Sequence, residues 1–172
     1  SDDVEARERN WTNAAQGVSE QLRSGKMCAF ATIGDPNVYS TFTYLARAVR
    51  EIEPDVEVET VPGITALQDL ASRSGPVLLE GDERLALLPF TAGEESLGEA
   101  LAGFETVVCY KGGSRLGEVL RVAEEGGRLE GAVYGARLGI EGEEVVPALQ
   151  MVGREGTYLS TVIFTGRSSE LE

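Results

Sequence analysis

Histidine is missing from all 172 residues of the chain. Without an imidazole, the sequence excludes Ser-His-Asp and Cys-His catalysis, histidine-based zinc sites and proton transfer by histidine. Any chemistry must therefore rely on positioning, on carboxylates, lysine, arginine or tyrosine, or on a cofactor that supplies its own reactivity.

Cysteine is almost as scarce, with two residues in the chain. Cys28 and Cys109 lie in the apolar, strand-like runs KMCAF and TVVCY. That setting is typical of buried free thiols and not of disulfides or metal ligands. We therefore expect both thiols to be buried and no residue to hold a metal.

Basic residues are too few to balance the acidic ones: 15 against 29, for a formal net charge of −14. That charge repels a nucleic-acid backbone, and no cluster of Lys and Arg offsets it. No apolar run approaches the roughly 20 residues needed to cross a bilayer, and the polar start SDDVEARERN does not resemble a signal peptide. The sequence predicts a cytoplasmic protein with neither nucleic acid nor membrane as a partner.

Hydrophobic residues make up 42% of the chain, which is enough for a core. Helical spacing predicts helices over residues 10–24, 38–52, 94–102 and 114–125, and one that runs through Ala71. Strand-like runs predict strands over residues 27–33, 56–61, 84–90, 105–110, 131–137 and 157–165. This rhythm predicts an α/β protein of two α/β units.

We place the two predicted domains at residues 1–78 and 79–172, because Gly, Pro and acidic residues cluster over residues 72–83. The first domain offers only two convincing strands, whereas sheets usually have about four to six. We therefore expect this domain to be incomplete, with its start missing.

The stretch TIGDPNVYST lies where a predicted strand gives way to a helix. Gly34 can adopt an unusual backbone conformation, Asp35 suits a helix N-cap, and Pro36 suits the first helical position. A capped turn explains all three residues. Ligands of open α/β sheets also bind at the carboxyl ends of strands, and VPGITA forms a second glycine turn there. Both interpretations stay open at this stage.

Nucleotide phosphates fit this turn poorly. The chain contains no GxGxxG and no GxxxxGK[ST], and GGSRLG at residues 112–117 has the wrong spacing. A carboxylate at residue 35 also disfavours an anion at a helix N-terminus. A nucleoside without phosphates, especially a positively charged one, fits better.

Five motifs together resemble the tetrapyrrole (corrin/porphyrin) methylase family: GDPNVYSTFTYL, VETVPGITAL, EGDERLALLP, GARLGIEGEEV and TYLSTVIF. The resemblance runs from about Ala31 to Arg167. GDPNVYST together with YLST is similar to the branch that methylates C-20 of precorrin-2 or cobalt-factor II in cobalamin biosynthesis.

The resemblance implies two α/β domains of the class III methyltransferase type, usually in a homodimer. It also implies S-adenosylmethionine as the methyl donor, with S-adenosylhomocysteine as its product, and a tetrapyrrole as the substrate. Matched by position, the residues that it implies at the cofactor site are Gly34, Asp35, Val38, Ser40, Thr41, Thr65, Ala66, Tyr110, Lys111, Arg137, Leu138, Leu159 and Ser160. Ser40 and Thr41 are expected to face either cofactor or substrate. No catalytic residue is identified.

The chain departs from the family pattern because it lacks the first strand and the GxGPGD loop that helps to bind the tetrapyrrole. The resemblance therefore leaves open whether this chain is active by itself. A related methylase acting on another tetrapyrrole, a protein side chain or rRNA is one alternative. A non-catalytic α/β ligand-binding domain is another.

A tetrapyrrole substrate carries many carboxylates, so an acidic protein needs local basic groups to bind it. The candidates are Arg47, Arg50, Arg73, Lys111, Arg115 and Arg137. Lys111 and Arg137 are the stronger ones, because each follows an apolar strand at its carboxyl end.

Overall fold

The structure is a computed structural model that describes residues 2–166, with side chains described from residue 9. Contacts between residues divide the chain after Thr65 into two units, each of which is described by itself. The predicted domain boundary near residue 78 remains a prediction.

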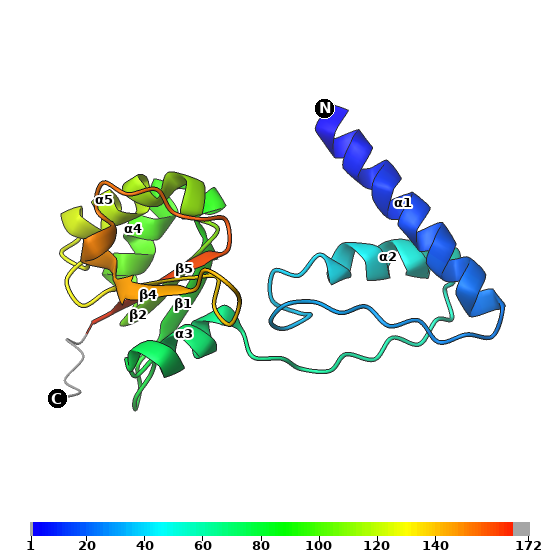
Figure 1. The fold of residues 1–172 in the computed structure, drawn as a ribbon, viewed down its shortest axis with the longest axis horizontal. Helices are drawn as coiled ribbons and strands as arrows, with labels where there is room; N and C mark the ends of the chain where they lie inside the picture. Colours follow the sequence, from blue (N-terminus) through cyan, green and yellow to red (C-terminus); the bar gives the residue numbers. More distant parts are fainter. Residues whose placement is uncertain (1, 167–172) are drawn as a thin grey trace. The chain divides into compact units, whose positions relative to one another are not determined.

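The second unit is built on a five-stranded sheet with the order β1-β2-β5-β3-β4 (Figure 1). β1 and β2 are parallel, and the other neighbouring pairs are antiparallel. The strands are β1 (Leu85–Pro89), β2 (Thr106–Tyr110), β3 (Val133–Ala136), β4 (Glu144–Pro147) and β5 (Ser160–Thr165). The predicted α/β class is confirmed. β4 was not predicted, because only a short EVVP run between glycine- and glutamate-rich residues marks it.

The two faces of this sheet bury different partners, as the alternation of side chains along a strand requires. Val107, Cys109 and Phe164 belong to one apolar core together with residues of α4 (Glu94–Gly103) and α5 (Leu116–Glu125). On the other face, α3 (Ala66–Ser74) packs so closely that a Cβ on Gly135 would meet Leu70 Cδ1 at 2.5 Å. Figure 1 shows α4 and α5 on one side of the sheet and α3 on the other. Short 3₁₀ helices follow β1 (Phe90–Ala92) and β4 (Ala148–Met151) and precede α5 (Gly113–Arg115).

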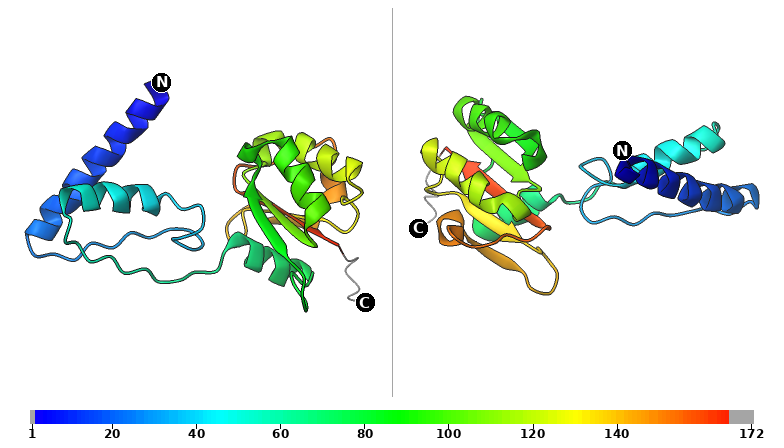
Figure 2. Two further views of the ribbon diagram at one scale, coloured as in Figure 1. Left: turned by 180° about the vertical axis from the view of Figure 1, so that it is seen from behind. Right: turned by 90° about the horizontal axis from the view of Figure 1, so that it is seen from above.

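The first unit contains two packed helices, α1 (Asp2–Arg23) and α2 (Phe42–Ile52), which Figure 2 shows side by side. Ala15, Ala46 and Val49 are buried in this unit. The Trp11 and Tyr44 rings stack with their centroids 6.1 Å apart. α1 begins well before the predicted residue 10, and α2 begins at Phe42 instead of the predicted residue 38.

The strands predicted at residues 27–33 and 56–61 do not form, so these two predictions were wrong. Both segments are extended without strand pairing, and among residues 2–65 the structure has no strand. A strand needs a neighbour for its backbone N–H and C=O groups, and these segments pair with none. Cys28 is consequently exposed, against our expectation, whereas Cys109 in β2 is buried as predicted.

Candidate functional site

The first group of candidate residues lies in the first unit, in the turn around Asp35. Its carboxylate accepts hydrogen bonds from the backbone N–H groups of Asn37 at 2.8 Å and Gly63 at 3.0 Å. These two bonds hold the pKa of Asp35 below its usual value, because they favour the ionised form. We had predicted that Asp35 caps the following helix. This prediction was wrong, because α2 starts seven residues further on, at Phe42.

The two glycine turns of the first unit lie against each other. A Cβ on Gly63 would meet the carbonyl oxygen of Gly34 at 2.1 Å, so only glycine allows this approach. Gly34 itself has φ +78°, a backbone conformation that suits glycine. The expected proximity of the two turns is therefore correct, although no sheet supports them. Thr65 directly follows the second turn.

Ser40 and its neighbours start α2. Ser40 is buried, and its Oγ accepts a hydrogen bond from the N–H of Phe42 at 3.2 Å. The Ser40 and Thr32 hydroxyls are also hydrogen-bonded, at 3.1 Å. Thr41 stands at the N-cap position without a side-chain capping bond, and Val38 N–H donates to the Asp35 carbonyl at 3.2 Å. The Ser40 hydroxyl thus has a local role in forming the helix start.

The second group of candidate residues lies in the second unit, along the edge of the five-stranded sheet at which β2 and β3 end and β5 begins. Strand register pairs Tyr110 at the end of β2 with Thr161 in β5, and Ala136 at the end of β3 with Ser160. The residues after β2 and β3 and those before β5 therefore lie at the same edge. This edge brings together six predicted site residues: Tyr110, Lys111, Arg137, Leu138, Leu159 and Ser160.

Backbone strain also marks this edge. Lys111 (φ +59°) and Arg137 (φ +50°) adopt the left-handed conformation that non-glycine residues rarely take. The other non-glycine residue with positive φ in residues 2–166 is Tyr39 (φ +51°), inside the NVYST turn. Strain of this kind clusters at ligand and active sites. Arg137 N–H donates to the Leu159 carbonyl at 2.9 Å, which joins two of the predicted residues directly.

Tyr110 has a structural role that the sequence did not reveal. Its side chain is 9% exposed, and its hydroxyl accepts a hydrogen bond from the N–H of Leu67 at 2.9 Å. Leu67 is the second residue of α3, directly after Ala66. The bond therefore ties the start of α3, and with it Ala66, to the sheet edge.

Thr157 and Gly113 also belong to this edge, and sequence reasoning missed both. A Cβ on Gly113 would meet the Thr157 carbonyl oxygen at 1.7 Å, and Ser160 Oγ donates to the same carbonyl at 2.7 Å. The Thr157 hydroxyl is buried and has no partner. Such a group is a donor and acceptor to which a ligand can bind. The GTYLST sequence, with a glycine next to a threonine before a strand, was the available signal.

Two of the six candidate cations are already neutralised by acidic neighbours. Arg73 pairs with Asp69 at 2.9 Å and with Glu143 at 3.1 Å. Arg115 pairs with Glu118 and lies 4.7 Å from the centroid of the Phe90 ring. These ion pairs raise the pKa of both guanidinium groups. Lys111 and Arg137 remain at the sheet edge as predicted.

No group of three or more His, Cys, Asp or Glu residues among residues 9–166, whose side chains the structure describes, is arranged to hold a metal ion. In the same residues, no helix has both the length and the apolar character needed to cross a membrane.

Residues 1–150 match the family model described as Tetrapyrrole (Corrin/Porphyrin) Methylases. The chain is 33% identical over 153 residues to the precorrin-2 C(20)-methyltransferase of Sinorhizobium sp, covering 89% of this chain and 61% of that protein. It is 27% identical over 165 residues to the cobalt-precorrin-2 C(20)-methyltransferase of Salmonella typhimurium, covering 95% of this chain and 68% of the relative.

Solved structures show the same fold. The methyltransferase CobJ is similar with a TM-score of 0.67 and 21% identity, over 90% of this chain and 70% of that one. The uroporphyrin-III C-methyltransferase of Thermus thermophilus, complexed with S-adenosylhomocysteine, has a TM-score of 0.55 and 22% identity. That match covers 77% of this chain and 62% of the Thermus chain.

Proposed function

We propose that this chain, which belongs to the tetrapyrrole (corrin/porphyrin) methylase family, is part of an S-adenosylmethionine-dependent methyltransferase of cobalamin biosynthesis. The family match over residues 1–150 is the observation that carries this proposal. The chain spans 61% of the length of the Sinorhizobium relative, so the proposal concerns the activity of the whole protein.

The reaction we propose is methylation of C-20 of precorrin-2 or of cobalt-factor II. Support comes from the names of two relatives, one a precorrin-2 and the other a cobalt-precorrin-2 C(20)-methyltransferase. Both names give C-20 as the position of methylation, but only one of them includes cobalt. They therefore support the position of methylation more than the metallation state of the substrate. Methylation of a different tetrapyrrole or another acceptor is the alternative.

The residues present fit S-adenosylmethionine by the chemistry of their donors and acceptors. Asp35 uses its two carboxylate oxygens for two backbone N–H groups, and each oxygen keeps room for a further donor. It can therefore accept from ribose hydroxyls or from the ammonium group of the cofactor. At the sheet edge, the unpartnered Thr157 hydroxyl offers another polar contact, and Leu159 offers apolar surface.

We propose that both sets of residues contribute to cofactor binding: Gly34, Asp35, Val38 and Thr65 in the first unit, and Ala66, Tyr110, Lys111, Arg137, Leu138, Leu159 and Ser160 in the second. Ser40 and Thr41 stay candidates for either cofactor or substrate. When bound, S-adenosylmethionine supplies an electrophilic methyl group on its sulfonium. This chain then has to bind the cofactor and the substrate, orient them and exclude water from them. These tasks need no imidazole, which suits a protein without histidine.

We assign no catalytic base. Carbon methylation must be followed by loss of a proton, and the chain holds no imidazole to accept it. Lys111 and Arg137 at the sheet edge are proposed instead to attract the carboxylates of the substrate. A homodimer and a cytoplasmic location remain predictions.

Calorimetric titration with S-adenosylhomocysteine tests the cofactor part of the proposal. We expect saturable binding, weakened about tenfold or more in Asp35→Asn, because the amide cannot accept at both positions and carries no charge. Asp55→Asn removes an exposed aspartate charge from the same unit and serves as the matched control. Equal affinity of Asp35→Asn and the wild type for S-adenosylhomocysteine would show that Asp35 does not contribute to the cofactor site. Absence of saturable binding by the wild type would contradict cofactor use by this chain.

The substrate part needs a separate assay. The protein is incubated with S-adenosylmethionine labelled with ¹³C in its methyl group and with either precorrin-2 or cobalt-factor II. Carbon NMR then identifies the methylated position. A methyl group at C-20 supports the proposed reaction and identifies the metallation state. A methyl group at another carbon replaces it with the alternative.

A further inference from the structure

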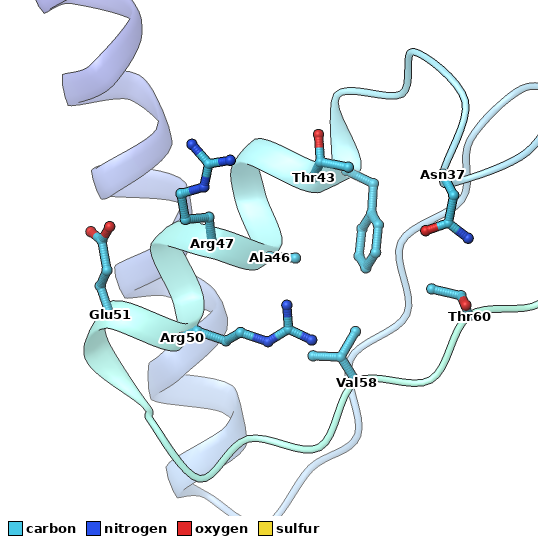
Figure 3. Close-up of a pocket in the computed structure, with 9 residues that line it drawn as sticks. Asn37, Thr43, Ala46, Arg47, Arg50, Glu51, Val58 and Thr60 are labelled. Atoms are coloured by element: carbon cyan, nitrogen blue, oxygen red, sulfur yellow. The ribbon is translucent and has the colours of Figure 1, made fainter.

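Among the candidate cations, Arg73 differs from Arg47 and Arg50 in what its guanidinium group joins. Arg47 and Arg50 line a groove of about 620 Å³ beside α2 and point to different sides of the helix (Figure 3). Arg73, near the end of α3, donates from Nε to Asp69 at 2.9 Å and from Nη1 to Glu143 at 3.1 Å. Asp69 lies on the same helix, whereas Glu143 lies 70 residues further along the chain, in the loop between β3 and β4. One side chain thus joins the helix to a distant loop.

Glu143 uses its second carboxylate oxygen to close this loop. That oxygen accepts a hydrogen bond from the backbone N–H of Gly139 at 2.6 Å. Gly139 (φ +74°) and Gly142 (φ +81°) both adopt left-handed conformations, and glycine leaves such a conformation more easily than any other residue. The Arg73 guanidinium also lies against Gly139, since a Cβ there would be 3.7 Å from Nη2. The contact with α3 therefore selects one conformation of a loop that has several available.

The same loop begins with two residues of the proposed cofactor site, Arg137 and Leu138. The Arg137 N–H donates to the Leu159 carbonyl at 2.9 Å. The Arg137 side chain lies across Gly142, because a Cβ on that glycine would be 2.8 Å from Nη1. Gly142 directly precedes Glu143, so a shift of Glu143 also moves the backbone on which the Arg137 side chain rests.

The start of α3 is held at the other proposed loop. Ala66, a proposed cofactor residue, is the first residue of the helix, and the N–H of Leu67 donates to the Tyr110 hydroxyl at 2.9 Å. Tyr110 therefore fixes the start of α3 to the end of β2, and Arg73 fixes its last turn to the loop after β3. The two loops that carry proposed cofactor residues are joined through one short helix.

We propose that Arg73 and Glu143 are positioning residues for the cofactor site. Their ion pair holds the β3–β4 loop in the conformation in which Arg137 and Leu138 contact S-adenosylmethionine. This inference rests on the proposed function, because it requires the cofactor to bind at this edge of the sheet. The two side chains are 38% and 35% exposed, and ion pairs this exposed contribute little to global stability. Their effect on affinity can therefore be measured in a folded protein.

Calorimetric titration with S-adenosylhomocysteine measures what the ion pair contributes. Arg73→Met keeps an unbranched side chain but removes the charge and the donors. We expect about fivefold weaker binding, because the loop must then be ordered when the ligand binds. Glu143→Ala also removes the acceptor for the Gly139 N–H, and about tenfold weaker binding is expected. Residues that act as one pair give non-additive losses, so adding Arg73→Met to Glu143→Ala should weaken binding by less than about twofold more.

Two further readouts distinguish positioning from general damage to the fold. Arg73→Lys keeps a cation in reach of Glu143 and is expected to restore the affinity to within about twofold of the wild type. In ¹⁵N NMR spectra of the free protein, the Arg137 amide signal of Arg73→Met should differ from the wild-type signal. At saturating S-adenosylhomocysteine it should return to the wild-type position, because the bound loop is the same. A damaged fold would show neither recovery.

The matched control is Arg121→Met, which changes the net charge equally. Arg121 lies on α5 and pairs with Glu94 and Glu125, on the side of the sheet opposite α3 (Figure 1). We expect its affinity for S-adenosylhomocysteine to stay within about twofold of the wild type, since salt screens an exposed charge at that distance.

Four outcomes overturn the inference, and the wild-type titration identifies which of them also affects the proposed function. Equal affinity of Arg73→Met and the wild type would show that the ion pair does not position the site. Equal losses in Arg73→Met and Arg121→Met would assign the effect to net charge. Losses that multiply in the double variant would show that the two residues act separately. In these three cases the proposed function stands, whereas absence of binding by the wild type would contradict both.

Discussion

The two units treat their large apolar side chains differently. In the second unit, Val108, Ile163 and Phe164 are completely buried around a sheet. In the first unit, Met27 is 95% exposed and Val61 is 82% exposed, although both lie in strand-like sequence. The difference shows that apolar sequence with a strand-like pattern is buried where strand partners supply a sheet, because an unpaired strand leaves its backbone polar groups unsatisfied.

The largest effect we predict tests this contrast in the two units. Phe164→Ala removes a fully buried ring and is expected to cost about 3–5 kcal/mol of stability, through lost burial and the cavity left behind. Val61→Ser, at an exposed position of the first unit, is expected to stay within about 0.5 kcal/mol. Hydrogen exchange of the β2 and β5 amides measures the former change, and Trp11 fluorescence during urea unfolding measures the latter. A large loss for Val61→Ser would show that the first unit buries this residue in solution.

The contact between the glycine turns gives the next largest effect. Gly63→Ala places a Cβ against the Gly34 carbonyl oxygen, at 2.1 Å in the present backbone, and is expected to cost about 1–3 kcal/mol. Gly17→Ala, in α1 with nothing within 4 Å of the new Cβ, is the matched control and is expected to stabilise by about 0.5–1 kcal/mol. Urea unfolding followed by Trp11 fluorescence distinguishes the two signs.

The same variant changes the titration of Asp35. Its pKa lies below the usual value chiefly because of the hydrogen bond from Gly63, so Gly63→Ala is expected to raise it toward 3.8. In the wild type, the ionised carboxylate stabilises the fold above the unfolded pKa, and this contribution is lost as the pH falls through the lower folded value. A ¹³C NMR titration of the Asp35 carboxyl measures the shift. An unchanged pKa would mean that the turns stay in contact despite the methyl group.

How far the sequence could predict this architecture depended on how local each feature is. Lys111 and Arg137 were placed correctly at strand ends, because a short apolar run followed by a turn is a local pattern. The bond from Gly63 to Asp35 spans 28 residues, and the bond from Leu67 to Tyr110 spans 43. No periodicity reveals which distant N–H a side chain will meet.

The two strand predictions at residues 27–33 and 56–61 were wrong for a related reason. Residues 56–61 alternate apolar and acidic side chains as a strand does, yet alternation describes only one partner of a pair. Pattern therefore predicted the sheet of the second unit, whose strands pair with one another, and not the state of the first unit.

A smaller effect on stability is expected from the hydrogen bond that joins the start of α3 to Tyr110 in the second unit. Tyr110→Phe removes the acceptor for the Leu67 N–H and is expected to cost about 1 kcal/mol, because water reaches a freed helix N-terminus readily. Amide exchange at Leu67 should quicken while that of β2 changes little. Tyr158→Phe, at a side chain 81% exposed, is the control and should leave both rates unchanged. Unchanged exchange at Leu67 in Tyr110→Phe would show that the hydroxyl does not hold the helix.

The smallest effect concerns the two cysteines, which report the contrast without altering stability. Cys28 is exposed in the first unit, whereas burial raises the pKa of Cys109 in β2 to about 12. Since the thiolate is the nucleophile, iodoacetamide at pH 8 is expected to modify Cys28 fully and leave Cys109 intact until the protein unfolds. Mass spectrometry of the digested protein measures both sites, with a urea-unfolded sample as the positive control. Protection of Cys28 would mean that residues 27–33 pack against a partner in solution. The two units would then not differ in how they bury their strand-like segments.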